Sequence, residues 1–248
     1  MKIDTCLDNF SIVSLDDLKS VRLMSRMDVK FAFNKMQLIP LLQKMQNFYD
    51  VLSLNDSKMQ LYKSLYYDTI GRDFFLDHHN NRVNRNKVRF REYVYSALSF
   101  LEIKLKNNKG KTIKTRTQVD DIPQFLSIDH QNYINRVIGK KLSLLPQHWI
   151  NFNRITFVNK ARTERITIDL DLNFFNNTSS GSFGNLVIAE IKKDRSGNSS
   201  IFTDLAKKMH ILPIRLSKYC MSTIELNPGL KYNRFKEKRL LINKLKNL

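Results

Sequence analysis

The most informative segment of the chain is Lys87–Lys106, which reads KVRFREYVYSALSFLEIKLK. Charged and apolar residues alternate in both of its halves. The charged positions are Lys87, Arg89 and Arg91 in the first half and Glu102, Lys104 and Lys106 in the second. Because a β-strand points successive side chains to opposite faces, each half predicts a strand with one apolar and one densely charged face. Rows of cations repel one another unless an anion lies against them, and a charged face that simply meets water is the ordinary alternative.

The same alternation recurs along the chain. Strands are also predicted at 26–31, 61–68, 74–79, 111–119, 150–159, 164–172 and 186–192, and helices at 34–49, 131–141, 202–210, 217–226 and 233–248. We therefore predict an α+β fold, an antiparallel β-barrel with a charged lumen and with helices packed outside and at the C-terminus. An open sheet with a charged groove is the alternative, and counting with a period of two does not separate it from the barrel.

The composition is that of one strongly basic domain. Forty-two Lys and Arg residues against 23 Asp and Glu residues give a formal charge of +19, which indicates a polyanionic partner such as nucleic acid, an anionic membrane surface or a phosphate chain. No repeat or low-complexity linker divides the 248 residues. We expect a single domain over 1–248, with a core at about 26–226, a mostly helical insertion at 120–149 and a basic C-terminal helix at 228–248.

Cysteine usage and hydropathy bear on the compartment. Cys6 and Cys220 are too few for a disulfide framework, and the N-terminus lacks the apolar core of a signal peptide. No segment reaches the roughly 18 apolar residues that a membrane span requires. We therefore expect a cytoplasmic protein. The C-terminal helix is either a solvated helix that caps the barrel or a helix that docks on a membrane surface or a membrane-protein partner.

The predicted charged faces combine many cations with a few acids. Arginine forks match phosphate oxygens bidentately, whereas lysines act as movable point charges. The basic set is Lys30, Lys87, Arg89, Arg91, Lys104, Lys106, Lys114, Arg116, Arg154, Arg165 and Lys192. The acids on these faces are Asp28, Glu102, Asp169 and Glu190, which either hold Mg²⁺ or Mn²⁺ through carboxylate oxygens or only pair with neighbouring arginines.

Several catalytic motifs are absent from the sequence. Without a GxxxxGK[ST] loop a P-loop nucleotidase is disfavoured, and without a CxxC pair or HExxH a zinc site has no support. We expect His79 to have a structural or phosphate-contacting role. Phosphoryl transfer through positioning and charge neutralisation requires no protein nucleophile.

Short motifs follow one another in order from Arg26 to Leu226. They are RMDVKF (26–31), YYDT (66–69), NRNKVRFREY (84–93), FLEIKLK (100–106), KTR (114–116), NR (153–154), RITIDLDLNF (165–174), VIAEIKKD (187–194) and RLSKY (215–219). This series resembles the VTC domain, the vacuolar transporter chaperone catalytic domain, within the triphosphate tunnel metalloenzyme or CYTH-like superfamily. The resemblance implies a tunnel of antiparallel strands that makes inorganic polyphosphate from ATP with a divalent cation.

The resemblance also implies roles for individual residues. Tunnel phosphate ligands are matched by Lys30, Arg89, Arg91, Lys104, Lys114, Arg154, Arg165 and Lys218; the metal-binding glutamate is matched by Glu190, and a usually basic position by Arg215. We expect the catalytic set to be Lys30, Arg89, Arg91, Lys104, Arg154, Arg165 and Lys218, with Lys87, Lys106, Lys114, Arg116, Lys192, Arg215 and His79 binding substrate. Glu190 is the expected metal ligand, with Asp28, Glu102 and Asp169 as further candidates. The superfamily's ExExK strand reads RMDVK here, with one acid instead of two, which weakens a two-metal triphosphatase assignment.

Four functions fit these patterns. The favoured one is a polyphosphate polymerase that uses Mn²⁺ or Mg²⁺ to transfer the terminal phosphate of a nucleoside triphosphate, with ATP as the expected donor, to a growing chain. A triphosphate or short-chain polyphosphate hydrolase and a non-catalytic polyphosphate- or nucleotide-binding module are alternatives. Specific nucleic-acid binding is disfavoured, because the basic strand faces also carry acids and show no evident interleaved aromatic platforms.

Overall fold

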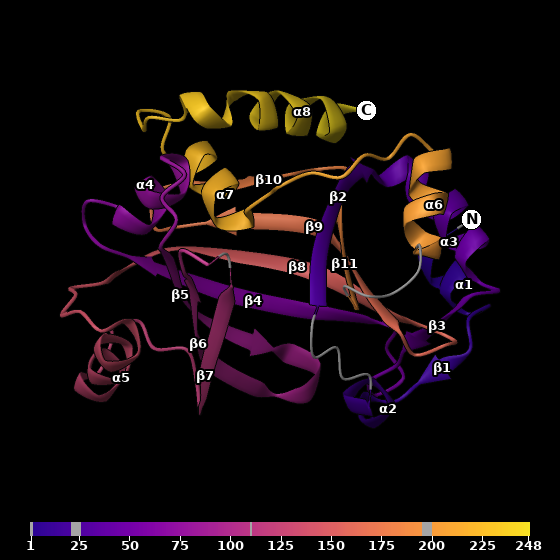
Figure 1. The fold of residues 1–248 in the computed structure, drawn as a ribbon, viewed down its shortest axis with the longest axis horizontal. Coiled ribbons are helices and arrows are strands. Elements are labelled where there is room, and N and C mark those ends of the chain that lie inside the picture. The colour runs from indigo at the N-terminus through magenta and orange to yellow at the C-terminus, as the bar shows by residue number, and fades with distance from the viewer. Residues whose placement is uncertain (1, 21–25, 110, 195–199) are drawn as a thin grey trace.

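One antiparallel sheet forms the framework of the protein, which is described by a computed structural model covering residues 2–20, 26–109, 111–194 and 200–248 (Figure 1). In spatial order its main strands are β2 (Arg26–Asn34), β11 (Leu186–Asp194), β9 (Glu164–Phe175), β8 (Leu145–Asn159), β4 (Met59–Asp68), β5 (Arg85–Tyr93), β6 (Leu98–Lys106) and β7 (Thr112–Val119). Short strands β1 (Ile12–Val13), β3 (Tyr49–Leu52) and β10 (Ser180–Ser182) pair at its margins.

Helices cover the outside and one end of this sheet (Figure 1). They are α1 (Ile3–Leu7), α2 (Leu15–Ser20), α3 (Leu38–Met45), α4 (Asp73–His79), α5 (Ile128–Ile138), α6 (Ile201–Lys208), α7 (Lys218–Leu226) and α8 (Lys236–Asn247), with 3₁₀ turns η1 (Lys35–Gln37), η2 (Val94–Ser96) and η3 (Asn233–Phe235). Within the predicted insertion at 120–149, α5 is the α-helix, and β8 begins at Leu145.

The strand predicted at 74–79 is wrong, because this segment is α4. The side chain of Asp68 at the end of β4 accepts hydrogen bonds from the backbone N–H groups of Phe74 and Phe75, at 2.9 and 3.0 Å. These groups lie in the first turn of the helix, where N–H donors otherwise lack an intrahelical partner. A short apolar run does not distinguish a buried helix from a strand by periodicity, so a side chain outside the run decides the outcome.

The α+β fold is confirmed, with an antiparallel sheet that curls around a charged interior and helices outside. Hydrogen bonds do not close the sheet, since no pairing joins β2 to β7 within the described ranges. Residues 211–217, which we call the strap, cross part of this seam. Ile214 N–H donates to the Lys30 carbonyl at 2.7 Å, and Lys87 Nζ donates to Ser217 Oγ at 2.9 Å. The strap thereby links β2 at one edge to β5 near the other.

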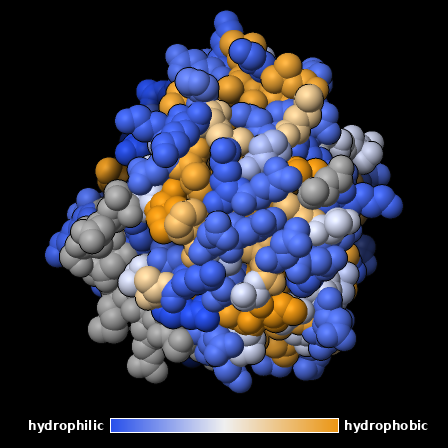
Figure 2. Space-filling model, turned by 90° about the vertical axis from the view of Figure 1, so that its right-hand side faces the viewer, coloured by the Kyte–Doolittle hydropathy of each residue, from blue (hydrophilic) through white to orange (hydrophobic). Residues whose placement is uncertain are grey.

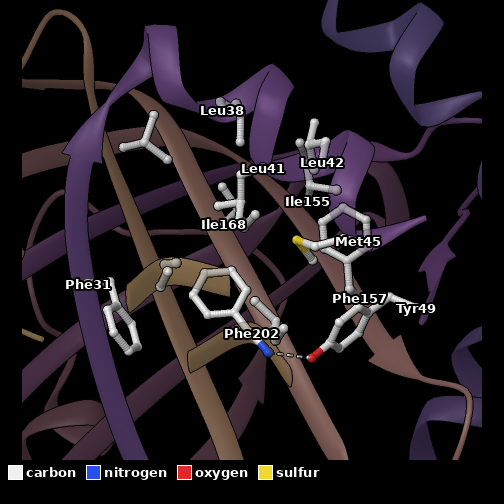
Figure 3. Packing of buried hydrophobic residues seen from close by; sticks show 14 of the residues in the cluster. Phe31, Leu38, Leu41, Leu42, Met45, Tyr49, Ile155, Phe157, Ile168 and Phe202 are labelled. Atoms are coloured by element: carbon white, nitrogen blue, oxygen red, sulfur yellow. Dashed lines mark hydrogen bonds between the residues drawn. The ribbon is translucent and has the colours of Figure 1, made fainter. Parts of the chain in front are cut away.

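The outward apolar faces of the strands form two cores. Under α1, α3 and α6, side chains such as Phe31, Phe157 and Phe202 pack against Leu38 and its neighbours (Figure 3). Under α4 and α5, the apolar residues of β4, β5 and β6 form the second core, which includes Phe90, Ile103 and Ile134. Burying such side chains contributes about 1.5–3 kcal/mol each. The charged faces are therefore turned inward.

One end of the interior is filled by an apolar plug. Inward residues at this end of the strands are apolar, and they pack with α7, η3 and α8. The plug contains Ala32, Tyr66, Ile150, Phe152, Leu172, Ile188, Tyr219, Ile224, Phe235 and Ile242. A tunnel running straight through the sheet is therefore blocked on the α7 side, and the charged residues lie further along the interior.

Candidate functional site

The charged faces of the two sheet halves meet across the interior. Lys104 on β6 interacts electrostatically with Glu190 on β11, and Lys87 on β5 with Lys30 on β2. Residues that belong to opposite ends of the strand order therefore form one group, which we call the inner charged cluster. Its members are Lys30, Lys87, Arg89, Arg91, Lys104, Lys114, Arg154, Lys192 and Lys218, with the acids Asp28, Glu102, Asp169 and Glu190.

Glu102 organises the β5–β7 side of the cluster. Its side chain is fully buried and accepts hydrogen bonds from Arg89 Nε, at 2.8 Å, and from Lys114 Nζ. Burial alone would raise the pKa of Glu102, but Arg89 and the neighbouring cations hold it below its ordinary value. Arg89 also donates from Nη1 to Tyr66 Oη at 2.8 Å. The guanidinium of Arg89 is therefore held from two sides.

Asp169 has the corresponding role on the β8–β9 side. Its carboxylate accepts from Arg154 Nη2 at 2.8 Å and from Lys218 Nζ at the start of α7. Burial raises the pKa of Asp169, but Arg154 and Lys218 outweigh that effect and lower it to about 2. Lys218 Nζ also lies 4.5 Å from the centre of the Phe152 ring, a cation–π contact. The plug helix α7 thus contributes a cation to the site.

Glu190 is more accessible than Glu102 and Asp169. Its side chain is 19% exposed, against 0% for Glu102 and 3% for Asp169. Lys192 Nζ lies 2.6 Å from Glu190 and 3.5 Å from Asp28, so one ammonium contacts both acids. Lys30 Nζ lies 3.4 Å from Glu190. Two carboxylates around one cation position are a donor set that suits Mg²⁺ or Mn²⁺.

The carboxylates alone do not complete a metal site. In the part of the chain that the structure describes, no group of three or more His, Cys, Asp or Glu side chains could hold a metal ion. Glu102 and Asp169 are buried and each already contacts two cationic side chains, so they fit the second possibility raised by the sequence, the pairing of acids with neighbouring bases. A divalent cation here would depend on Glu190, Asp28 and oxygens from a bound phosphate.

Two other cations in the cluster, Lys104 and Arg91, form no ion pair with a carboxylate of the described residues. Lys104 lies directly across from Lys87 on β5 and Lys114 on β7, and its ammonium has no hydrogen bond or ion pair with any described residue. Arg89 and burial hold the pKa of Lys104 well below its ordinary value. Arg91 is buried, and its Nε donates to Ser64 Oγ at 2.9 Å. Since uncompensated cations in a buried setting are costly, these residues indicate an anionic ligand.

Four other expected site residues lie around the cluster. Arg165 on β9 is paired in register with Lys192, on the inward face. Arg116 stacks over the Phe100 ring at 4.5 Å and is exposed. Lys106 lies near Arg215 of the strap, and the two interact electrostatically. These positions extend the positive charge from the cluster toward the edges of the sheet.

His79 is not brought to the cluster. It is buried at the end of α4, where its Nδ1 is 3.0 Å from Asn80 Oδ1 and its Nε2 accepts from the backbone N–H of Arg234 at 3.4 Å. Its ring packs edge-on against Phe235. These contacts favour the structural role over the phosphate-contacting role.

Uncharged inward residues of β4 also belong to the site, although the pattern of charges in the sequence does not point to them. Tyr62, Ser64 and Tyr66 share the inward face. The Tyr62 ring contacts the guanidinium groups of Arg91 and Arg154. Ser64 Oγ accepts a hydrogen bond from Arg91, and Tyr66 Oη accepts one from Arg89. Their spacing of two in the predicted strand was the available signal. Charged residues alone do not reveal this face.

Comparisons with known proteins bear on the family. The VTC-domain profile matches residues 25–227, and no curated protein matches the chain. Among solved structures, a candidate adenylate cyclase from Vibrio parahaemolyticus has a TM-score of 0.48 at 13% identity, covering 79% of this chain and 97% of its own. HpAC1 from Hippeastrum, described as having a dominant triphosphatase activity, has 0.48 at 13%, covering 84% and 98%. The PH1819 protein from Pyrococcus horikoshii has 0.47 at 11%, covering 83% and 99%.

The family assignment rests on the profile, because these TM-scores lie below 0.5. None of the described helices combines the length and apolarity that crossing a bilayer requires. The profile spans most of the chain and includes every strand that contributes to the inner charged cluster. The chain belongs to the VTC-domain family.

Proposed function

We propose that this protein is a metal-dependent phosphotransferase that binds a nucleoside triphosphate in the inner charged cluster and adds its terminal phosphate to inorganic polyphosphate. The observation that carries the proposal is the presence of inward cations, Lys104 and Arg91, without a carboxylate partner. A phosphate chain is slim and highly charged, so it can compensate several such cations at once. Membership of the VTC-domain family supports polyphosphate as the product.

The cluster contains both fixed and movable cations. Arg89 is held by Glu102 and Tyr66, and Arg154 by Asp169, so their guanidinium groups are oriented before substrate arrives. Fixed donors aimed at transferring phosphoryl oxygens need no reorganisation during the reaction. Lys104, which has no partner of this kind, can follow the phosphate as charge moves from the γ-phosphoryl group to the leaving group.

Glu190 and Asp28 are the residues that would hold a divalent cation together with phosphate oxygens. When bound, Mg²⁺ or Mn²⁺ would neutralise phosphate charge in a loose phosphoryl-transfer transition state. Lys192 contacts both carboxylates and so balances their negative charge before a metal cation binds. No protein nucleophile is required, and the attacking group is the terminal phosphate of the polymer.

Hydrolysis of a triphosphate or short polyphosphate is the second candidate, because water can attack in the same arrangement of cations. Binding without turnover is the third. One assay separates them. Purified protein is incubated with ATP and Mn²⁺ or Mg²⁺, long polyphosphate is detected by gel staining, and free phosphate is measured in the same samples.

Polyphosphate is the expected product. Free phosphate alone would assign the protein as a hydrolase, and tight triphosphate binding without either product would assign it as a binding module. The variant Lys104→Met should abolish product formation. Lys63→Met is the matched control, because Lys63 pairs with Glu92 on the outer side of neighbouring strands, at 3.3 Å. Absence of triphosphate binding by the unmodified chain would refute all three assignments.

A further inference from the structure

Two leucines of α8 are exposed among its polar side chains, where a fully solvated helix would carry polar residues. The inner face of this helix packs into the plug through Ile242 and Leu245. Away from this inner face, Leu240 is 60% and Leu241 is 40% exposed. The helix lies along the edge of the molecule with no other element over it (Figure 1). These leucines therefore contribute little to the folded core, although they lie in a well-anchored helix.

Cations surround the exposed leucines. Lys236 and Lys244 are exposed and stand one helical turn before and after Leu240. The helix and the turn before it also carry Lys231, Arg234, Lys238 and Lys246, whereas Glu237 is the one acid of the segment 231–248. Arg239 is compensated separately by Glu225, at 2.8 Å. The outer face thus combines exposed apolar side chains with an excess of positive charge.

The tertiary structure fixes how this face is presented. Asn34 Nδ2 on β2 donates to the Leu245 carbonyl at 2.6 Å, so the last turn of α8 is tied to the sheet. Gly184 lies close to the Lys246 carbonyl: a Cβ at this glycine would lie 3.1 Å from the oxygen, which is tighter than an ordinary van der Waals contact. The helix cannot turn its leucines inward without breaking these contacts.

We propose that α8 docks lengthwise on an anionic lipid surface, with Leu240 and Leu241 entering the headgroup region and the flanking lysines on the lipid phosphates and carboxylates. Helices of this composition lie in the plane of the interface, and they require both apolar area and attraction to anionic lipid. An anionic surface complements the charge of the face, and the leucines distinguish it from a nucleic-acid backbone, which offers no apolar layer.

The arrangement has a consequence for the site. Since α7, η3 and α8 together form the plugged end, docking through α8 places that end against the membrane (Figure 1). The inner charged cluster then lies on the side of the plug that faces away from the lipid. Figure 2 shows a face of the molecule on which apolar side chains form separate areas between hydrophilic ones.

Co-sedimentation of the full chain with vesicles tests the proposal. We expect binding to phosphatidylcholine vesicles containing about 30% phosphatidylserine, little binding to pure phosphatidylcholine, and loss of binding at high salt. Lys236→Glu with Lys244→Glu should weaken binding at least tenfold, since each basic residue near such a surface contributes a factor of about five. Leu240→Ser with Leu241→Ser should weaken it by a similar factor.

Matched control variants lie on the α5 side of the molecule. Phe125→Ser with Ile128→Ser removes two apolar side chains that are 69% and 77% exposed, and Lys140→Glu with Lys141→Glu reverses two charges. Both controls should bind the vesicles as the unmodified chain does.

Weaker vesicle binding by a variant can be distinguished from loss of its fold. Thermal unfolding of each variant shows whether it is folded, and because the two α8 variants change different exposed side chains, either alone can decide the question. The proposal is overturned if the unmodified chain does not bind anionic vesicles, if it binds neutral vesicles equally, or if the control variants lose binding to the same extent. Binding of duplex DNA that depends on Lys236 and Lys244 but not on the leucines would instead assign the face to nucleic acid.

Discussion

Replacing Glu102 by glutamine tests whether the interior is built to hold an anion. The Glu102 carboxylate is fully buried and contacts Arg89 and Lys114, with Tyr93 Oη at 3.4 Å. Glutamine keeps the size and one acceptor oxygen but removes the charge. Two cations then remain in the interior without their counterion, and Lys104 on the same strand adds to the repulsion.

The expected loss of stability can be estimated from the structure. Removing one partner of a buried ion pair costs about 3–5 kcal/mol, and the lower end applies because Arg89 keeps its hydrogen bond to Tyr66. One kcal/mol corresponds to roughly 2–4 °C in a domain of this size, so the unfolding temperature should fall by about 6–12 °C. The folded pKa of Glu102 is lowered from 4.5, so its contribution is complete above pH 4.5 and diminishes as the pH falls below that value.

Added anion should reverse the loss. Inorganic triphosphate restores negative charge beside Arg89 and Lys114, so it should raise the unfolding temperature of Glu102→Gln by more than that of the unmodified chain. Scanning calorimetry with and without triphosphate measures both quantities. Glu92→Gln on β5 is the control, because Glu92 forms a partly exposed pair with Lys63 that is worth about 0–1 kcal/mol. An unfolding temperature of Glu102→Gln equal to that of the control would contradict this prediction. Stabilisation of the variant by triphosphate that does not exceed that of the unmodified chain would contradict it as well.

Three further predictions concern the same cluster. Glu190→Gln should abolish metal-dependent turnover and largely retain triphosphate binding, and unchanged Mn²⁺-dependent activity would remove Glu190 from the mechanism. Arg89→Ala with Arg91→Ala should lower triphosphate affinity by about a hundredfold or more in a binding titration. Weak, salt-sensitive DNA binding by the same variant should persist, and an equal loss of both would indicate an open binding surface. Because Arg89 and burial lower the pKa of Lys104, triphosphate binding should draw a proton onto Lys104 at alkaline pH, and affinity should fall as the pH rises through the folded pKa. Calorimetry in buffers of different ionisation enthalpy measures this uptake, which Lys104→Met should abolish.

Local patterns in the chain were sufficient for the main strands of the sheet and their faces. The alternation in Lys87–Lys106 predicted two strands with inward charges, and β5 and β6 pair with Arg89 directly across from Glu102. Periodicity is reliable here because a strand has a period of two wherever it lies, and the apolar parity must be buried. The ordered motifs also indicated the VTC-domain family, which the profile match confirms.

Contacts between distant segments decided the rest. Asp68 at the end of β4 converts the apolar residues after it into α4, and this moves His79 away from the charged interior. Glu102, Asp169 and Glu190 each lie on the charged face of their strand, but only the fold shows that the first two are buried against cations while Glu190 is more accessible.

Contacts between distant segments also form the plug. Residues 217–226 read as a helix from the sequence, but their position inside one end of the sheet depends on Tyr219 donating to Asp68 at 2.6 Å and on apolar side chains from several strands. Parity specifies which face of a strand a side chain occupies. Which charges meet, and which end is blocked, follows from the curvature of the sheet and the docking of helices, since these arise from interactions between residues far apart in the chain.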